Sequence, residues 1–433
     1  MANILTPVDV YKLVNDIQKQ ATGQVSIQAV DTSSFVAVGE AILRTGTENT
    51  LNAISTVLMR TIISRRPYDN KLGILEGSSE RWGAVIRKLN FFDLEFEEST
   101  AYNATNATTG ATQAPLTDGQ SVDMYTIKKP KTLQINFTGT KVLQNHYTVF
   151  RDQLAQAFRS ESEFASFIEG FLVNWSNMME QKKENEDRLV LINAITGKYA
   201  MSNYCVDLVA EFNTKYGTTY TRDQLLTTYL TDFAKFVSAR VKTDSKRLEN
   251  RTISYHANLS AYPGILRHTP KRNQKMIMYS PLFIDIEANV YSTIFNPSYL
   301  GVGAFKEITY WQEPTHPTEV KGKPNILNVV NGESTTASEA VVFDYVLGIL
   351  YDDEFMGTNY QFETSVTTPL NAAGLYYNVF THVRKNYWTD YTENAIVYYL
   401  GAGGAPANSE TPGVETTNST KKSTVAKKET VSE

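Results

Sequence analysis

The sequence predicts an α+β protein of several parts, and three observations lead to this prediction. The 433 residues exceed the roughly 150 that are usual for one domain, so we expect two or three packed regions. The N-terminal 66 residues carry helical patterns, whereas the second half mixes helical and strand-like patterns. Between them, one helical pattern continues from Ser160 to Gly197, which is far longer than a small domain needs.

Composition and charge narrow the class of protein. Hydrophobic residues make up 42% and charged residues 20% of the chain, as is ordinary for a soluble protein. The net charge of -5 argues against a protein that binds nucleic acid over its whole surface, because such binding neutralises phosphates with Lys and Arg. The N-terminus has neither a basic leader nor an uninterrupted apolar segment, so we expect no signal peptide, no membrane span and synthesis in the cytoplasm.

Three amphipathic helices are expected at the N-terminus. The first covers residues 6–22, with apolar side chains at helical spacing. The second starts at Ser33 and is closed by Gly46, and the third starts at Thr47 and ends before Pro67. These helices leave little room for a core of their own, so we expect them to pack on another part of the protein.

Two strand-like stretches flank a segment of low complexity. Apolar and polar residues alternate from Phe92 to Phe96 and again from Leu133 to Phe137. Residues 98–119 between them have no Lys or Arg and no helical or strand period. A long excursion of this kind is uncommon in a compact domain and is usually functional, so we expect a hairpin arm with a flexible tip.

The pattern that starts at Ser160 is the strongest local signal in the chain. Ser160 and Glu163 are spaced as a capping box, and Gly197 is placed to supply a left-handed C-terminal cap. Apolar residues at helical spacing connect the two ends, among them Trp175 and Met178. We therefore expect one long helix that serves as a structural spine.

The second half is expected to mix helices and strands, and the C-terminus to lack structure. Thr221 and Gln224 begin a second capped helix, and residues 275–280 form a strand followed by a helix. Four later strand-like stretches end with "NAIVYYL". Residues 401–433 contain no aromatic residue, Leu or Ile, so they cannot bury enough surface to fold alone.

The sequence shows no catalytic constellation, no cofactor-binding motif and no metal site. Cys205 is the only cysteine, and we expect it to be a buried small hydrophobe. The five histidines lie far apart, which gives no support for a zinc site. The "GAGGAP" stretch from Gly401 is not followed by a helix that could hold a phosphate. We therefore assign no catalytic, cofactor-binding or metal-binding residue and no cofactor.

Two charged stretches leave alternatives open. Asp352, Asp353 and Glu354 could bind a hard cation, as a metal-dependent enzyme requires, although a solvated turn between two strands is favoured. The one basic region runs from Arg240 to Lys275 and is interpreted as a solvated or subunit-facing surface, with a weak phosphate-contacting patch as the alternative.

The order of the parts resembles the major capsid protein family of tailed bacteriophages. The closer likeness is to small short-tailed, podovirus-type phages of Gram-positive hosts. Three passages carry it: "KPKTLQINFTGTKVLQNHYTVFRDQLAQAF", "KMIMYSPLFIDIEANVYSTIFNPSYLGVGAFKEITYW" and "LYYNVFTHVRKNYWTDYTENAIVYY". None is a short diagnostic motif, so the likeness rests on their order, spacing and texture.

The resemblance implies the tailed-phage major capsid fold and a division of the chain into six parts. They are a helical N-terminal arm (1–80), an extended β-hairpin loop (83–140), a peripheral domain with the spine helix (141–197), an axial domain (198–365), return strands of the peripheral domain (366–400) and a flexible polar tail (401–433).

The resemblance also implies a function and partners. The chain is expected to be a non-enzymatic head protein of the virion, assembled in the host cytoplasm into pentamers and hexamers of an icosahedral or prolate shell. Its expected partners are many copies of itself, a scaffolding protein, a portal and weakly, non-specifically bound double-stranded DNA on the inner face, with no membrane. The alternatives are an encapsulin-like nanocompartment shell protein and the metal-dependent enzyme.

Overall fold

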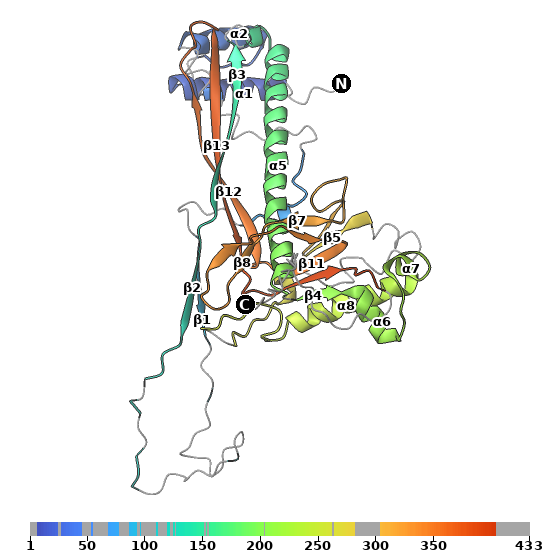
Figure 1. Ribbon diagram of the computed structural model, residues 1–433. Helices are drawn as coiled ribbons and strands as arrows, with labels where there is room; N and C mark the ends of the chain where they lie inside the picture. Colours follow the sequence, from blue (N-terminus) through green and yellow to red (C-terminus); the bar gives the residue numbers. More distant parts are fainter. Residues whose placement is uncertain are drawn as a thin grey trace, which may run out of the picture. The chain divides into compact units, whose positions relative to one another are not determined.

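In the computed structural model, the chain forms two compact units (Figure 1). The first unit comprises Met1–Asn185 with Gly357–Trp388, and the second comprises Glu186–Met356 with Thr389–Glu433. The structure describes residues 7–24, 27–45, 53–54, 68–77, 86–92, 96, 110, 119–121, 124–125, 127–150, 153, 156–202, 204–261, 264–281 and 304–403.

Two helices open the first unit, as predicted. Helix α1 (Pro7–Thr22) buries Val10, Val14 and Ile17 at helical spacing. Helix α2 (Thr32–Arg44) begins one residue before the predicted Ser33, because the Asp31 side chain accepts a hydrogen bond from the Ser34 N–H and caps the helix. Most of the third predicted helix and the closing Gly46 lie outside the described residues.

The N-terminal helices do pack on another part of the chain. The Tyr11 hydroxyl of α1 and the Thr32 hydroxyl of α2 donate to the Glu161 carboxylate at the start of helix α5 (Glu161–Ala200). Phe35 of α2 contacts Phe164 of α5 edge to face, with ring centroids 5.9 Å apart. These contacts build one apolar core from α1, α2 and the first turns of α5.

The long helix α5 is confirmed, but its predicted end is wrong. At its start, the Ser160 hydroxyl accepts a hydrogen bond from the Glu163 N–H at 3.3 Å, as expected of the cap. At the other end the helix continues through Gly197 to Ala200, and Gly197 does not have a left-handed φ. A Cβ at Gly197 would overlap the Tyr391 hydroxyl, so the glycine serves close packing and not chain reversal.

Two sheets complete the first unit. Strands β1 (Ile86–Phe91) and β2 (Thr132–Phe137) form a two-stranded antiparallel sheet. Strands β12 (Met356–Thr367), β13 (Tyr376–Thr389) and β3 (Thr140–Phe150) form a three-stranded sheet in that order (Figure 1). Strand β13 pairs with β3 over eleven residue pairs, from Tyr376 opposite Phe150 to Asn386 opposite Thr140.

The first strand of the predicted arm lies within the strand-like stretch expected from Arg81 to Ser99, as β1 (Ile86–Phe91). The alternation predicted from Phe92 to Phe96 falls mostly on residues 93–95, which are outside the described set. One residue beyond β1, the Phe92 N–H donates a hydrogen bond to the Lys131 carbonyl at 2.9 Å.

The second unit is built around a five-stranded sheet with the order β4-β14-β11-β5-β6. The central pairs β14–β11 and β11–β5 are antiparallel, and the outer pairs β14–β4 and β5–β6 are parallel. The strands are β4 (Cys205–Asp207), β14 (Ala395–Tyr399), β11 (Val346–Asp352), β5 (Gln274–Tyr279) and β6 (Ala304–Ile308).

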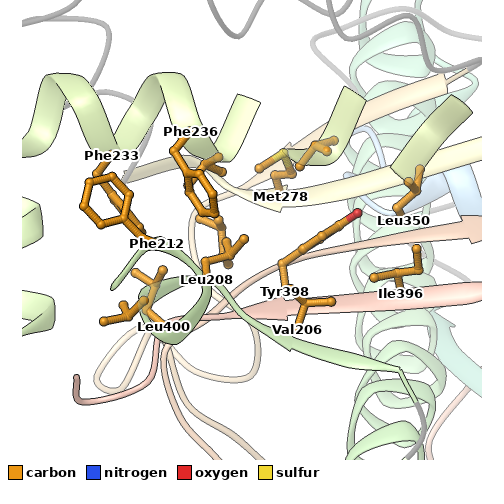
Figure 2. Close-up of a cluster of buried hydrophobic side chains, with 14 of the residues drawn as sticks. Val206, Leu208, Phe212, Phe233, Phe236, Met278, Leu350, Ile396, Tyr398 and Leu400 are labelled. Atoms are coloured by element: carbon orange, nitrogen blue, oxygen red, sulfur yellow. The ribbon is translucent and has the colours of Figure 1, made fainter. Parts of the chain in front are cut away.

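Helices cover this sheet and form its core with it (Figure 2). They are α6 (Leu208–Tyr216), α7 (Arg222–Thr227) and α8 (Leu230–Leu248). Phe212 of α6 packs edge to face against Phe233 and Phe236 of α8, with centroids 5.6 Å and 5.4 Å apart. Leu350 and Ile396 from the sheet are fully buried in the same cluster.

Two predicted elements of this unit are interrupted. The capping box of Thr221 and Gln224 is confirmed, but the helix that it starts ends at Thr227, and α8 begins at Leu230. The strand predicted from residue 340 onward splits into β10 (Val341–Phe343) and β11, because Tyr345 between them has a positive φ of 52° that a strand cannot accommodate.

Short elements complete the described chain. Strand β7 (Val320–Gly322) pairs with β10, and β8 (Asn325–Leu327) pairs with β9 (Ser334–Thr336). Single 3₁₀ turns occur at η1 (Gly73–Leu75) and η2 (Lys271–Asn273). Among the described residues, no helix is long and apolar enough to cross a membrane.

Candidate assembly surface

The sheet of β1 and β2 exposes large apolar side chains. On one side of β1, Leu89 is 55% and Phe91 is 71% exposed, opposite Gln134 and Thr132 of β2. An isolated two-stranded sheet is marginally stable in water, and large apolar side chains that remain exposed mark a surface for another molecule. This sheet is therefore a candidate surface for binding a second protein chain.

The exposed apolar character extends beyond the paired strands. We define the arm surface as Leu89, Phe91, Phe96, Met124, Tyr125 and Ile127, which are all more than half exposed. The sequence predicted the alternation in β2, where Leu133 is buried and Gln134 and Asn136 are exposed. It did not single out Met124, Tyr125 or Ile127, although three large apolar residues so close together beside a low-complexity segment were a visible signal.

A second apolar surface of the first unit is a groove between α5 and the three-stranded sheet. The groove has a volume of about 240 Å³ and is lined by Trp175, Met178 and Met179 of α5, by Leu143 of β3 and by Val383 of β13, among others. Met178 is 57% exposed, although the sequence placed it on the apolar stripe of the helix. The groove thus leaves part of the predicted stripe accessible.

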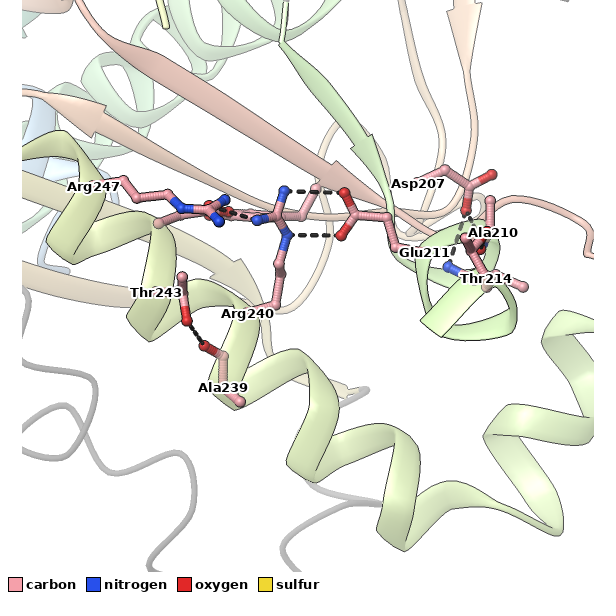
Figure 3. A network of polar contacts seen from close by, with 11 residues as sticks. Asp207, Ala210, Glu211, Thr214, Ala239, Arg240, Thr243 and Arg247 are labelled. Atoms are coloured by element: carbon pink, nitrogen blue, oxygen red, sulfur yellow. Dashed lines mark hydrogen bonds and ion pairs between the residues drawn. The ribbon is translucent and has the colours of Figure 1, made fainter. Parts of the chain in front are cut away.

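In the basic region of the second unit, at least four of the nine Lys and Arg residues form ion pairs with acidic side chains, and the network around Arg240 is shown in Figure 3. The Arg240 guanidinium contacts both Glu211 oxygens, with an Nε to Oε2 distance of 2.7 Å, and donates to Asp244 Oδ1 at 2.8 Å. Arg247 also faces Asp244, at 3.6 Å. Burial raises the pKa of Asp244 to about 6, and the charge of Arg240 opposes that rise.

The same pattern continues along this region. Arg267 pairs with Glu393 at 3.1 Å, and Lys271 pairs with Glu249 at 3.7 Å. A cation that is paired with a carboxylate contributes little net charge toward a phosphate. Of the two interpretations left open by the sequence, these ion pairs favour a solvated or subunit-facing surface over a weak phosphate-contacting patch.

The acidic stretch at the end of β11 forms the expected turn between two strands, with Glu354 exposed, but Asp352 is not solvated. Asp352 is buried, and its carboxylate accepts hydrogen bonds from the Thr269 hydroxyl at 2.7 Å and from the Glu354 N–H at 3.0 Å. Asp353 accepts from the Asn273 amide at 3.2 Å. The Asp352 side chain is thus committed to the protein interior, and within the described ranges no three acidic, His or Cys side chains converge to hold a metal ion.

Two other predicted features are located by the structure. Cys205 is half-buried on the edge strand β4, which corrects the expectation that it is buried. Desolvation still raises the pKa of its thiol to about 12, so the thiol is not a nucleophile near neutral pH. In the glycine-rich stretch, the Arg222 N–H donates to the Ala402 carbonyl and Gly403 bridges to Thr221. Residues after Gly403, which are all but the first three residues of the predicted tail (401–433), lie outside the described part of the chain.

Comparison with known protein families assigns most of the chain to one family. The family described as Phi29-like phage major capsid protein matches residues 14–399. Comparison with curated protein sequences gives no match.

Among solved structures, the capsid structure of Staphylococcus phage Andhra aligns with a TM-score of 0.49 at 9% identity, over 79% of this chain and 87% of that chain. The capsid structure of the cyanophage P-SCSP1u aligns with a TM-score of 0.40 at 10% identity, over 79% and 90%. A chain of Microbacterium phage Oxtober96 aligns with a TM-score of 0.38 at 9% identity, over 79% and 94%.

Proposed function

Because this chain belongs to the Phi29-like phage major capsid protein family, we propose that its copies assemble through the arm surface into the pentamers and hexamers of a phage head. The chain is a major capsid protein and part of the virion. What stays a proposal is the arrangement of the copies, and the observation that supports it is the arm surface.

The energetics of the arm surface favour contact between copies. Fully burying a large apolar side chain contributes about 1.5–3 kcal/mol relative to leaving it exposed. Leu89 and Phe91 lie side by side in one exposed row of β1, so a neighbouring chain can cover both at once. In a shell every subunit makes this contact, so a small gain in free energy for each subunit adds up over the whole assembly.

The division of the chain into functional parts is proposed on the same basis. We assign residues 1–80 to a helical arm, 83–140 to an extended loop, 141–197 and 366–400 to a peripheral domain, 198–365 to an axial domain, and 401–433 to a polar tail. Helices α1 and α2, the β1–β2 sheet, the continuous helix α5 and strand β13 support this division, because each occurs in the expected order along the chain. Strand β14 departs from it, because β14 pairs with β4 and β11 in the sheet of the second unit although its residues fall in the 366–400 range.

The remaining partners are proposed from charge and from the family. Double-stranded DNA inside the head would be held weakly, because the net charge is -5 and the basic region of the second unit is paired with carboxylates. A scaffolding protein and a portal are expected because a shell of defined size needs a guide and an entry point. We also propose that the protein is not an enzyme, since Asp352 is engaged by Thr269 and Glu354.

Of the alternatives, the family match favours the viral shell over an encapsulin-like nanocompartment. The metal-dependent enzyme loses its basis, because Asp352 and Asp353 are hydrogen-bonded to protein groups and not gathered around a common point. Calorimetric titration with magnesium, calcium or manganese is expected to show no binding at these carboxylates.

The experiment that tests the proposal is negative-stain electron microscopy of the expressed protein, alone and with its scaffolding protein. Wild-type protein is expected to form shells, tubes or rings. The double variant Leu89→Ser and Phe91→Ser is expected to remain unassembled while its circular dichroism matches that of the wild type. Thr132→Ser, on the same exposed side of the sheet, is the matched control and should assemble normally. Normal shells from the double variant would contradict a role for the arm surface.

A further inference from the structure

Four side chains of the second unit form a continuous buried chain of hydrogen bonds, which we call the relay: His256, Asn394, Thr269 and Asp352. His256 Nδ1 lies 3.1 Å from Asn394 Oδ1, the Asn394 amide nitrogen lies 3.1 Å from the Thr269 hydroxyl, and that hydroxyl donates to Asp352 Oδ2 at 2.7 Å. The four residues are 0–7% exposed, so water cannot replace a missing partner.

The relay joins three segments of the fold. His256 and Thr269 belong to the α8–β5 connection, residues 249–273. Asp352 is the last residue of β11, and Asn394 immediately precedes β14. The relay therefore ties a long connection, whose described residues include the 3₁₀ turn η2 and no α-helix or strand, to the ends of two central strands of the sheet.

The partners of His256 restrict how protons are arranged in the relay. His256 Nε2 lies 2.9 Å from the Ile265 carbonyl, which can only accept, so Nε2 carries a hydrogen. With the Asn394 oxygen facing Nδ1, that nitrogen must carry a hydrogen too, and the imidazole is charged. The charge is then balanced by an ionised Asp352 at the other end of the relay.

A second complete arrangement exists with the same number of protons. If the Asn394 amide turns over, its nitrogen donates to His256 Nδ1 and its oxygen accepts from the Thr269 hydroxyl. The Thr269 oxygen then accepts from Asp352, which carries the proton as a neutral acid. Between the two arrangements one N–H bond at His256 is lost and one O–H bond at Asp352 is formed, so the proton is conserved within the relay.

Removing that one proton leaves the relay incomplete. With a neutral His256 and an ionised Asp352, the Thr269 hydroxyl faces two acceptors, Asn394 and Asp352, and its single hydrogen can serve only one of them. One link is lost in a buried place, where an unpaired acceptor is costly. We propose that the relay is a pH-sensitive latch, which holds the α8–β5 connection to β11 and β14 while it keeps its proton and opens one link when the proton leaves.

The surrounding charges determine where the proton resides and when it leaves. Desolvation lowers the pKa of His256, and the charges of Arg267 and Lys198 lower it further, against the hydrogen bonds from Asn394 and Ile265. These effects favour the neutral imidazole.

At the other end, desolvation raises the pKa of Asp352 to about 7, and Glu393 and Asp353 add to the rise, against the hydrogen bonds from Glu354 and Thr269. The Lys275 ammonium also faces Asp352 and Asp353, and its charge favours the ionised carboxylate. Desolvation and the two neighbouring carboxylates outweigh it, so the neutral arrangement is favoured and its proton is lost near neutral pH.

Hydrogen exchange of the full chain, held in one assembly state, tests this proposal. Amide protection of the α8–β5 connection is compared at pH 6 and pH 8.5 after correction for the intrinsic exchange rate. Loss of one hydrogen bond corresponds to a decrease in protection of about fivefold at the higher pH. Asp352→Asn can complete the relay without a titrating proton, so its protection is expected to be high and equal at both pH values.

Two further measurements make the result unambiguous. Glu354→Gln removes the exposed acid two residues away and is expected to lose protection as the wild type does. Infrared spectroscopy of the wild type is expected to show protonated-carboxyl absorption at pH 6 that disappears by pH 8.5. In Asp352→Asn this absorption should be smaller by one carboxyl, while the part from Asp244, whose pKa is also raised to about 6, remains. Protection of the wild type that is independent of pH, or an Asp352→Asn variant with the same pH dependence as the wild type, would overturn the latch.

Discussion

The five-stranded sheet of the second unit buries all seven residues of its central strand β11, whereas strand β1 of the arm alternates between half-buried and exposed residues. Both are β-structure, but among the described residues helices cover the first sheet, whereas the β1–β2 sheet leaves Leu89 and Phe91 exposed. The difference indicates that the second unit is stabilised within one subunit, while the arm sheet gains its full stability from other chains. Substitutions in the two sheets should therefore separate folding from assembly.

The largest effect is expected in the core of the second unit. Ile396 is fully buried beside Leu350, and truncating such a residue removes apolar contacts and leaves a cavity. Ile396→Ala should lower the free energy of unfolding by about 2–5 kcal/mol. Chemical denaturation of the unassembled subunit, followed by circular dichroism, measures this change. A loss below about 1 kcal/mol would show that this core is not what stabilises the subunit.

A smaller effect, with the opposite sign, is expected from Asp352. Its pKa is about 7 in the folded protein and near 3.8 without the surrounding structure. Between these pH values the folded state keeps a proton that the unfolded chain loses, so this contribution to stability is complete below about pH 4 and is lost as the pH rises through 7. Asp352→Asn should therefore raise the free energy of unfolding at pH 8 by on the order of 2 kcal/mol.

Denaturation curves at pH 5 and pH 8 check the sign of this prediction. The gain from Asp352→Asn should shrink at pH 5, where the wild-type carboxyl is already protonated. Glu354→Gln is the matched control, because its side chain is exposed, and it should change little at either pH. A variant that loses stability at pH 8 would mean that the ionised carboxylate is favoured in the folded state.

Two glycines of helix α5 differ in the same way, because one lies in a packed environment and the other does not. A Cβ at Gly197 would overlap the Tyr391 ring, whereas a Cβ at Gly170 would meet no atom within 4 Å. Gly197→Ala should destabilise by about 1–3 kcal/mol through overpacking, and Gly170→Ala should stabilise by up to about 1 kcal/mol through helix propensity. Adding Tyr391→Phe to Gly197→Ala should recover part of the loss. Equal changes at both glycines would contradict this account.

Helices and strands that depend on local pattern could be predicted from the sequence. Helix α1, the start of α5 and the capping box at Thr221 follow from spacing and capping residues alone. The resemblance of three passages was enough to identify the family. These features have in common that neighbouring residues in the sequence determine them.

Features that depend on distant residues could not be predicted. The end of α5 was placed at Gly197 because a glycine after an apolar run is typical of a C-terminal cap, but this glycine makes room for Tyr391, which is far away in the sequence. The turn between β11 and β12 was expected, but the burial of Asp352 beside it was not, because Thr269, whose hydroxyl donates to this carboxylate, is distant in the sequence. The relay has no sequence signature, because its four members come from three segments that are distant in the sequence.

The smallest effect on folding is expected from the arm surface. Leu89 is 55% exposed in the single chain, so Leu89→Ala removes little buried area and should change the free energy of unfolding of the unassembled subunit by less than about 0.5 kcal/mol. In the assembled shell the same side chain is proposed to be covered by a neighbouring copy, and its loss should lower the temperature at which shells dissociate. Light scattering during heating measures dissociation, and denaturation of the free subunit measures folding. An equal loss in both measurements would mean that Leu89 belongs to the core of its own subunit, and the contrast between the two sheets would then be wrong.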